Sequence, residues 1–366
     1  MKKENGFSKI LLILIVLVII CGIGGFIAYN TYNSLLEPLQ SNSEKIVVTI
    51  TEGSGISGIA DKLEKEGVIK SANAFKVYCK LSKDTITMQA GKYELDKSMS
   101  VQDIVKNLSS GQIVDETVKI TFVEGKNMRN IASVIAQKTN NTEEDIFNLL
   151  QNEEYIDSLI KKYWFIDEDI KDEDIYYSLE GYLYPDTYIL ADKNEDVKTI
   201  FSRMLDKMES ILNESKEDIE DSKYSVHELL SLASVVELEA KNDEDRDEVA
   251  GVFYNRLNRK MALQSDVTTY YACKIDMSER DLTAAELARK NPYNTRSSSM
   301  AGKLPVGPIC MVSKTSIKAA ITPKDTDAIF FVADKNGKVY FSKTNSEHEK
   351  IINDLKKQGL WYTYEE

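Results

Sequence analysis

The longest apolar stretch of the chain lies near its first residues and has the length of a membrane span. Residues 10–36 carry no charge, and the first part of this stretch, 10–28, is almost wholly apolar. An α-helix needs about 20 such residues to cross a bilayer. A secretory signal peptide would have a shorter apolar region and a small-residue cleavage site. We therefore expect this segment to remain in the protein as a single transmembrane anchor.

The charges on the two sides of this stretch predict its orientation. Three lysines precede it within residues 1–9, and the first charge after it is Glu37. Lysines beside a span favour the cytoplasmic side of the membrane. The sequence therefore predicts a cytoplasmic tail over 1–9, a transmembrane helix over 10–30 and a polar linker over 31–44. The bulk of this single-pass cell-membrane protein is expected outside the cytoplasm.

After the linker, a strand-turn-helix pattern occurs twice. Residues 47–53 form a β-rich run with an alternating pattern that ends in a Glu-Gly turn, and apolar residues then recur at helical spacing over 56–63. Residues 118–125 and 128–135 repeat this arrangement. A period of two indicates a strand, and spacings of three and four indicate a helix. The sequence thus predicts two related strand-turn-helix units.

Further elements between these units complete a small domain. Residues 75–81 predict a helix and 90–95 a strand, and 101–108 predict another helix with Ser100 as its N-cap. We interpret residues 45–115 as one compact α+β domain of ordinary size. The residues alone favour a spacer role and a glycan-binding role about equally.

The rest of the chain predicts a larger α+β domain over 116–366. Its leading part, 116–224, contains acidic helical segments, an aromatic loop at 179–188 and a helix at 200–212. The tyrosines of the loop could line a sugar site by ring stacking or pack a core. The core part, 225–366, holds a strongly apolar helix followed by polar turns. The expected fold class is α+β, with one transmembrane helix, a small domain and a larger domain.

Composition excludes several kinds of function. The formal net charge is −13 at pH 7, which argues against a nucleic-acid partner because phosphate binding needs a basic surface. Only two histidines are present, so a histidine-rich zinc site is not expected. The acidic run at 242–248 lacks the glycine of a calcium-binding loop. We expect no metal and no cofactor, and we expect carboxylates to carry the chemistry.

The four cysteines do not predict a disulfide framework. Cys21 lies within the expected membrane span, which leaves Cys79, Cys273 and Cys310 outside it. At most one bridge can form among these three, and Cys273 with Cys310 is one possible pair.

An apolar helical run at 229–240 carries a carboxylate, Glu237, in its middle. Helical spacing places Glu237 between Leu230 and Ala233. An ionised carboxylate is poorly solvated among apolar neighbours, so burial would favour the protonated form that a general acid needs. The same pattern fits a structural glutamate that pairs with Arg246 or Arg256.

Polar side chains follow this run on a second helix and on several turns. They are Asn255, Arg256, Gln264, Asp266, Tyr293, Asn294 and Thr295. These residue types offer hydrogen-bond donors and acceptors but no strong nucleophile. Such a set is typical of a sugar-binding site.

Five motifs follow one another in the chain: LEGYLYPDTY at 179–188, ASVVELE at 233–239, VFYNRL at 252–257, LQSDVT at 263–268 and YNT at 293–295. In order and spacing they resemble the endolytic murein transglycosylases of the MltG (YceG-like) family. The resemblance covers almost the entire expected extracytoplasmic part. It implies a LysM-like domain at 45–115 and a YceG-like catalytic domain at 116–366.

The resemblance also implies a reaction, the cleavage of the MurNAc-β-1,4-GlcNAc bond of nascent peptidoglycan. The 6-hydroxyl of the sugar attacks C1 and leaves a 1,6-anhydro end. One glutamate therefore serves first as acid and then as base, whereas an ordinary glycosidase needs two carboxylates. The family's catalytic glutamate falls on Glu237 and a second family glutamate on Glu239. The match implies that Glu239 and the seven polar residues above bind substrate.

The implied partners are peptidoglycan glycan strands and membrane-bound peptidoglycan synthases, and the implied role is to terminate strand elongation. The chain departs from the family pattern at 302–313, where GKLPVGPICMVS replaces a Gly-Leu-Pro-Pro-Gly-Pro-Ile-Asn-Pro-Gly motif, and at Val339, which replaces a common histidine. A competing interpretation is a non-catalytic scaffold that binds the cell wall. New glycan chain ends would distinguish the enzyme from the scaffold.

Overall fold

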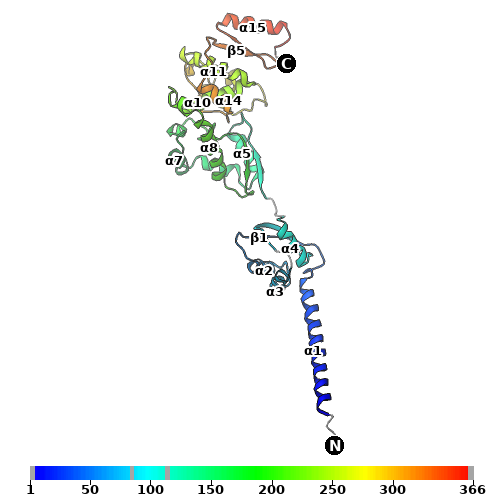
Figure 1. Ribbon diagram of the computed structural model, residues 1–366. Helices are drawn as coiled ribbons and strands as arrows, with labels where there is room; N and C mark the ends of the chain where they lie inside the picture. The colour runs from blue at the N-terminus through cyan, green and yellow to red at the C-terminus, as the bar shows by residue number, and fades with distance from the viewer. Residues whose placement is uncertain (1–4, 83–85, 112–115, 362–366) are drawn as a thin grey trace. The chain divides into compact units, whose positions relative to one another are not determined.

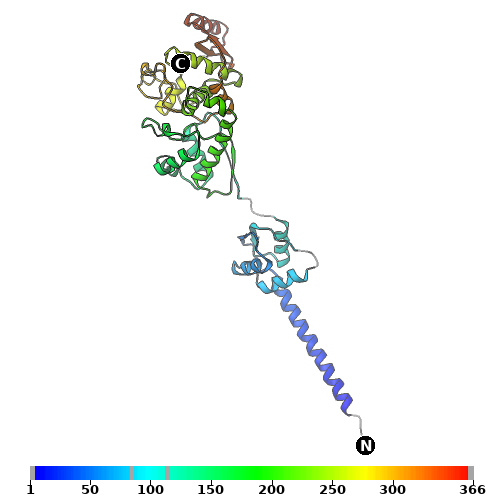
Figure 2. The same cartoon turned by 60° about the vertical axis from the view of Figure 1, so that its left-hand side comes forward.

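The structure is a computed structural model that describes residues 5–82, 86–111 and 116–361. The chain divides into two compact units, Met1–Glu116 and Thr117–Glu366, and the ribbon in Figures 1 and 2 shows both. The sequence predicts a domain boundary between residues 115 and 116. Each unit contains helices and strands, which confirms the α+β class.

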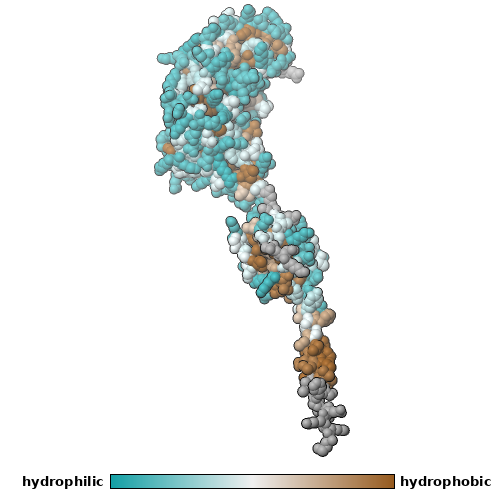
Figure 3. Space-filling view, viewed as in Figure 1, coloured by the Kyte–Doolittle hydropathy of each residue, from teal (hydrophilic) through white to brown (hydrophobic). Residues whose placement is uncertain are grey.

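Helix α1 (Asn5–Leu36) contains the expected membrane span. Its part from Leu11 to Leu36 is long and apolar enough to cross a bilayer, and its side chains are not buried by the rest of the protein. Figure 3 shows the resulting hydrophobic surface. The predicted linker at 31–44 needs a correction, because residues 31–36 continue the helix. Packing explains the difference, since Leu36 contacts the core of the small unit.

The described part of the small unit pairs two antiparallel strands and packs three helices around one core. The strands are β1 (Lys45–Ile50) and β2 (Gly91–Asp96), and the helices are α2 (Ile56–Lys65), α3 (Ala72–Leu81) and α4 (Val101–Ser110). Ser100 caps α4 and forms a capping box with Asp103, as its sequence predicts. Leu63, Phe75 and Tyr93 are fully buried in the core. The three elements predicted between the repeats are confirmed, with small shifts at their ends.

The larger unit begins with the second copy of the strand-turn-helix arrangement. Strand β3 (Val118–Thr121) leads through Gly125 into α5 (Met128–Lys138), as β1 leads through Gly53 into α2. The two glycines have φ values of 72° and 78°, which residues with a Cβ rarely adopt. Strand β3 pairs with β4 (Thr187–Leu190). The helices of this leading part are α6 (Glu143–Leu150), α7 (Glu153–Lys162), the short η1 (Glu168–Lys171), α8 (Val197–Asn213) and α9 (Lys216–Glu220).

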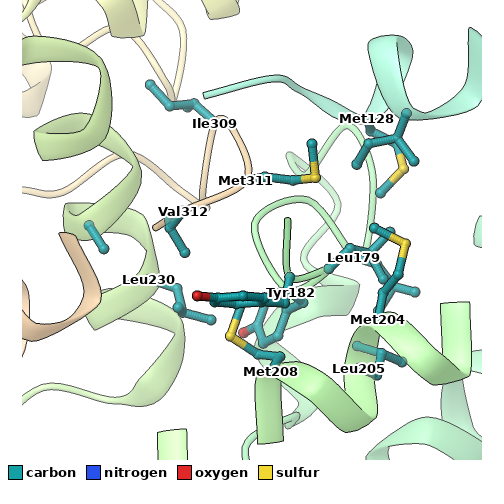
Figure 4. Packing of buried hydrophobic residues seen from close by; sticks show 14 of the residues in the cluster. Met128, Leu179, Tyr182, Met204, Leu205, Met208, Leu230, Ile309, Met311 and Val312 are labelled. Atoms are coloured by element: carbon teal, nitrogen blue, oxygen red, sulfur yellow. The ribbon is translucent and has the colours of Figure 1, made fainter. Parts of the chain in front are cut away.

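The aromatic loop at 179–188 packs into the core of the larger unit. Tyr182 and Leu183 are fully buried, and Figure 4 shows Tyr182 beside Met208 and Leu230. Met208 belongs to α8 and Leu230 to α10 (Val226–Glu239). Of the two roles that the sequence leaves open for this loop, the structure shows core packing.

Glu180 of the same loop is a buried carboxyl group with only 1% of its surface exposed. Both of its oxygens accept from the backbone N–H of Met128 at 3.0 Å, and Oε2 accepts from the hydroxyl of Tyr271 at 2.9 Å. Burial raises the pKa of Glu180 to about 7, although these hydrogen bonds oppose the shift. Glu180 therefore connects α5 to α12 (Asp266–Cys273) through a group that titrates near neutrality.

The second half of the larger unit surrounds α10 (Val226–Glu239). The other described elements are α11 (Asp243–Asn258), α12, α13 (Ala284–Leu287), η2 (Ser298–Met300), α14 (Lys314–Ile321), β5 (Phe330–Ala333), β6 (Val339–Ser342) and α15 (Asn345–Lys357). Helices α11, α12 and α14 all pack against α10, and its residues from Leu229 to Val236 are buried. After this buried stretch, partial exposure begins again in the last turn, where Glu237 and Glu239 lie.

The four cysteines are free thiols. Cys273 ends α12 and is partly exposed, whereas Cys310 is buried and its Sγ lies 3.4 Å from the carbonyl oxygen of Ser234. The bridge considered between Cys273 and Cys310 is not formed.

Candidate active site

Glu237 and Glu239 lie on different sides of the last turn of α10. Residues that are two positions apart in an α-helix, such as 237 and 239, are separated by about 200° around the helix axis. The two carboxyl groups consequently have different partners, and the structure distinguishes them in a way that the sequence does not.

Glu237 is held in a buried ion pair. Its side chain is 5% exposed, and its Oε2 lies 2.8 Å from Nη1 of Arg246, which belongs to α11. The same oxygen accepts from the backbone N–H of Ser313 at 2.8 Å and from its hydroxyl at 2.5 Å. These three donors hold Oε2 of Glu237 in place between α10, α11 and α14. Glu237 thus makes the ion pair with Arg246 that its structural interpretation considers.

Arg246 extends this ion pair into a network between helices. Its Nη1 also donates to the hydroxyl of Ser316 at 2.7 Å and of Thr315 at 3.1 Å, both on α14. Ser313 is the N-cap of α14. Glu237 and Arg246 thus join the ends of α10, α11 and α14.

Among the described residues, Glu239 has one hydrogen-bond partner, and that partner is neutral. Its Oε1 accepts a hydrogen bond from the hydroxyl of Ser265 at 2.6 Å. Burial raises the pKa of Glu239, the hydrogen bond from Ser265 opposes this shift, and nearby Asp266 adds to it. The positive charges of Arg256 and Arg296 lower it more weakly. A carboxyl group with a raised pKa beside cations can release a proton and then exist as an anion, as a general acid and base must.

Glu239 lines a polar cavity of about 370 Å³. Its walls come from the end of α10, from α11, from the loop before α12, from β5 and from the start of α15. The lining residues are Glu239, Phe253, Arg256, Leu263, Gln264, Ser265, Asp266, Val267, Arg296, Phe330, Phe331, Asn345 and His348. Four of the predicted site residues therefore share one cavity, namely Glu239, Arg256, Gln264 and Asp266. Glu237 does not line this cavity.

Arg256 supports one wall of the cavity through buried hydrogen bonds to backbone carbonyls. It is buried, its Nε donates to the carbonyl of Ile329 at 2.7 Å, and its Nη1 donates to that of Leu263 at 2.8 Å. It fixes the loop before α12 against the start of β5. Next in this loop, Gln264 has a φ of 55°, a conformation that costs energy for a residue with a Cβ. The exposed Gln264 side chain is thereby presented at the cavity.

Asp266 and Arg296 form an ion pair at the rim of the cavity. Arg296 Nη1 lies 2.6 Å from Oδ1 of Asp266, and it also donates to the carbonyl of Gln264 at 3.2 Å. Both side chains are partly exposed, so a ligand can replace part of their hydration.

Tyr293, Asn294 and Thr295, three of the predicted substrate ligands, do not line this cavity. All three are fully buried. Thr295 accepts from the backbone N–H of Ser265 through its Oγ1 and from that of Gln264 through its carbonyl. Their polar groups are used to hold the protein's own backbone.

Asn294 donates to the carbonyl of Arg289 at 2.7 Å and accepts from the hydroxyl of Thr269. Tyr293 packs against the rings of Tyr176 and Tyr271. Neither side chain is directed at the cavity.

Asn255, another predicted substrate ligand, does not line the cavity and bonds to the protein's own backbone. Its Nδ2 donates to the carbonyls of Thr326 at 2.6 Å and Ala328 at 3.0 Å. Asn255 anchors the segment before β5 to α11, next to Arg256, which bonds to Ile329 at the end of the same segment.

Arg296, His348 and Phe330 are among the cavity residues that the sequence prediction did not include. Arg296 directly follows the YNT motif, and extending that motif by one position would have included it. His348 and Phe330 come from the last 40 residues and stack on each other with ring centroids 5.2 Å apart. Burial lowers the pKa of His348, so a neutral imidazole faces the cavity.

Comparisons with known proteins agree on one family. The YceG-like family model matches residues 48–354. An endolytic murein transglycosylase of Bacillus subtilis (strain 168) is 37% identical over 329 residues, which cover 89% of each chain.

Two further relatives extend this agreement. An endolytic murein transglycosylase of Streptococcus pneumoniae (serotype 2, strain D39) is 34% identical over 346 residues, which are 90% of this chain but 62% of that protein. The crystal structure of a yceG-like protein from Listeria monocytogenes has a TM-score of 0.60 and 35% identity, and the match covers 85% of this chain and all of that one.

Proposed function

Because the chain belongs to the YceG-like family, we propose that it is a peptidoglycan lytic transglycosylase, a lyase that cuts glycan strands internally. The names of its relatives support both the substrate and the endolytic mode. The observation that carries the proposal is the polar cavity that contains Glu239, Arg256, Gln264 and Asp266. Arginine, amide and carboxyl groups around one protonatable acid fit the recognition and cleavage of a sugar chain.

The resemblance assigns the acid to Glu237, and the geometry leads us to propose Glu239 in its place. Glu239 lines the cavity and has a raised pKa. Glu237 has its Oε2 occupied by Arg246 and Ser313. Withdrawing Glu237 from those donors would leave a buried guanidinium short of a partner, which is costly.

In the proposed reaction, Glu239 donates its proton to the glycosidic oxygen while the bond from that oxygen to C1 of MurNAc breaks. The GlcNAc side leaves with a 4-hydroxyl. The resulting carboxylate then accepts the proton of the MurNAc 6-hydroxyl as O6 bonds to C1, which forms the 1,6-anhydro end and restores the acid. Arg256 and Arg296 favour the transient carboxylate by their positive charge.

Two parts of the proposal concern location. We propose that α1 is a single-pass membrane anchor with a short cytoplasmic N-terminus, which its length and apolar surface support. We also propose that the small unit is LysM-like and holds glycan strands, and that the protein works beside membrane-bound synthases to end strand elongation. The compact α+β core of the small unit supports an independent binding module.

Incubation of the protein with purified glycan strands tests the activity. Mass spectrometry should detect new chain ends that carry 1,6-anhydro-MurNAc, and their number should increase with time. Binding without new ends would instead support the non-catalytic scaffold. Reducing ends that are not anhydro would indicate hydrolysis and a different mechanism.

A further inference from the structure

We propose that α3 of the small unit lies in the headgroup layer of the membrane and that its exposed Val77 and Leu81 bind lipid. This inference rests on the proposed anchoring role of α1. It adds a second contact with the membrane, which would hold the small unit against the bilayer surface. The argument depends on where α3 meets α1 and on which side chains α3 exposes.

Helix α3 packs directly against the end of α1. Tyr32 of α1 lies near Tyr78 and Cys79 of α3. The ammonium group of Lys70, just before α3, donates to the carbonyl of Ser34 at 3.0 Å. Helix α1 and the small unit therefore form one body, so the depth of α1 in a bilayer also determines the position of α3.

The length of the apolar segment gives that position. A hydrocarbon core of about 30 Å takes about 20 helical residues, so a span that starts at residue 10 ends near residue 29. The headgroup layer adds about 5–8 Å on each side, or about four to five further residues. Tyr32, which lies near α3, and Ser34, which accepts from Lys70, fall within this layer. The side of α3 that faces away from the small unit's core must then face lipid headgroups.

The exposed surface of α3 suits that environment. Val77 and Leu81 are 43% and 70% exposed, and they lie four positions apart on one face of the helix. Lys80 is exposed beside them, and Tyr78 is half-buried. Apolar residues flanked by lysine and an aromatic ring are typical of helices that lie in a membrane interface. Figure 3 shows hydrophobic surface where the small unit meets α1.

The position beside α1 favours lipid over a protein partner. A protein would have to reach α3 within the headgroup layer, whereas lipid is already there once α1 is inserted. The burial of two aliphatic side chains then requires no further component.

The test uses the full-length chain in vesicles of phosphatidylglycerol and phosphatidylcholine with acyl chains brominated at carbons 6 and 7. Bromine quenches tryptophan fluorescence at close range. A tryptophan is introduced in Leu81→Trp, and a control in Val47→Trp, because Val47 is 51% exposed on β1, which Figure 1 draws at the end of the small unit away from α1. The parent protein, whose two tryptophans lie in the larger unit, gives the background.

We expect quenching at position 81 to exceed that at position 47 at least twofold, and Val77→Trp to behave like Leu81→Trp. Equal and weak quenching at all three positions would overturn the docking of α3. Flotation of the same vesicles tests the anchoring by α1 separately from the docking of α3. Protein that floats without quenching retains the anchor and loses the docking, and protein that does not float contradicts both.

Discussion

Ser265 donates a hydrogen bond from its hydroxyl to Oε1 of Glu239, and the two oxygens lie 2.6 Å apart. Ser265 is buried and its backbone N–H is held by Thr295. The donor is therefore fixed in place before any substrate binds. This bond is the one direct contact through which the loop before α12 acts on the proposed acid in the described structure.

Removing that donor should change the pH dependence of cleavage. The hydrogen bond from Ser265 lowers the pKa of Glu239, so in Ser265→Ala this pKa rises and the acid stays protonated to higher pH. We expect the alkaline limb of kcat/KM to move to higher pH, with kcat reduced about tenfold by loss of a bond to a charged group. The rate of anhydro-end formation measured across pH 4 to 9 checks this.

Ser313→Ala is the matched control, because Ser313 makes the corresponding hydrogen bond to Glu237. It should lower stability through loss of the N-cap of α14 and leave the pH profile unchanged. A shifted profile in Ser313→Ala with an unshifted one in Ser265→Ala would reverse the roles of the two glutamates.

The ion pair at the rim of the cavity should affect substrate binding more than chemistry. In Arg296→Ala, Asp266 loses its partner and the cavity loses a cation. We expect KM for glycan strands to rise about tenfold, which corresponds to about 1.4 kcal/mol, with a smaller change in kcat. Arg280→Ala removes an exposed arginine that pairs with Glu286 outside this cavity, and its KM should match the wild type. Equal KM values for both variants would remove Arg296 from the binding site.

Arg246 should be essential for stability. Arg246→Met leaves Glu237 buried without its charged partner, and breaking such a pair costs about 3–5 kcal/mol. Urea denaturation followed by circular dichroism should show this loss in the larger unit. The double variant Arg246→Met with Glu237→Met removes both charges, so it should recover a large part of the loss. A double variant no more stable than Arg246→Met alone would show that the network on α14 matters more than the pair.

Glu180 should make the protein less stable as the pH rises towards neutrality. Its pKa is about 7 in the folded chain and near the ordinary glutamate value of 4.5 when unfolded. The folded state therefore binds the proton more tightly, and the resulting stability is complete below pH 4.5 and is lost as the pH rises through 7.

The difference between the folded and unfolded pKa values of Glu180 corresponds to about 3 kcal/mol in the free energy of unfolding. Glu180→Gln stays neutral and can still accept from Met128, so its free energy of unfolding should lack this component of the pH dependence. Parallel stability curves for the wild type and Glu180→Gln between pH 4.5 and 8 would contradict the assignment.

Most of the fold was predictable because helix caps, apolar patterns and turn glycines occur in the sequence where the packing also favours those elements. Ser100 before an apolar helical pattern marked α4, and the Glu-Gly turns of both repeats needed the positive φ that Gly53 and Gly125 provide. The end of α1 was not predictable from composition. Residues 31–36 are polar enough for a linker, and only contacts with α3 and the small core explain why they remain helical.

The identity of the cavity glutamate was not predictable for a related reason. Helix α10 is buried on all sides from Leu229 to Val236, so no hydrophobic face indicates which side of its last turn meets a cavity. Asn255, Asn294 and Thr295 show a second limit. A polar side chain on a turn has the same sequence signal whether it binds a ligand or the protein's own backbone, and here the backbone accepts or donates the bonds.

The central claim is that Glu239 transfers the proton, and mass-spectrometric counting of 1,6-anhydro ends for Glu239→Gln beside Glu237→Gln tests it most directly. The account predicts that Glu239→Gln loses at least about a hundredfold in rate, as expected for loss of a general acid, while it keeps the wild-type melting temperature. Glu237→Gln should remain active within about tenfold and melt earlier, because its ion pair is weakened. An active Glu239→Gln, or a folded Glu237→Gln that makes no anhydro ends, would contradict the account.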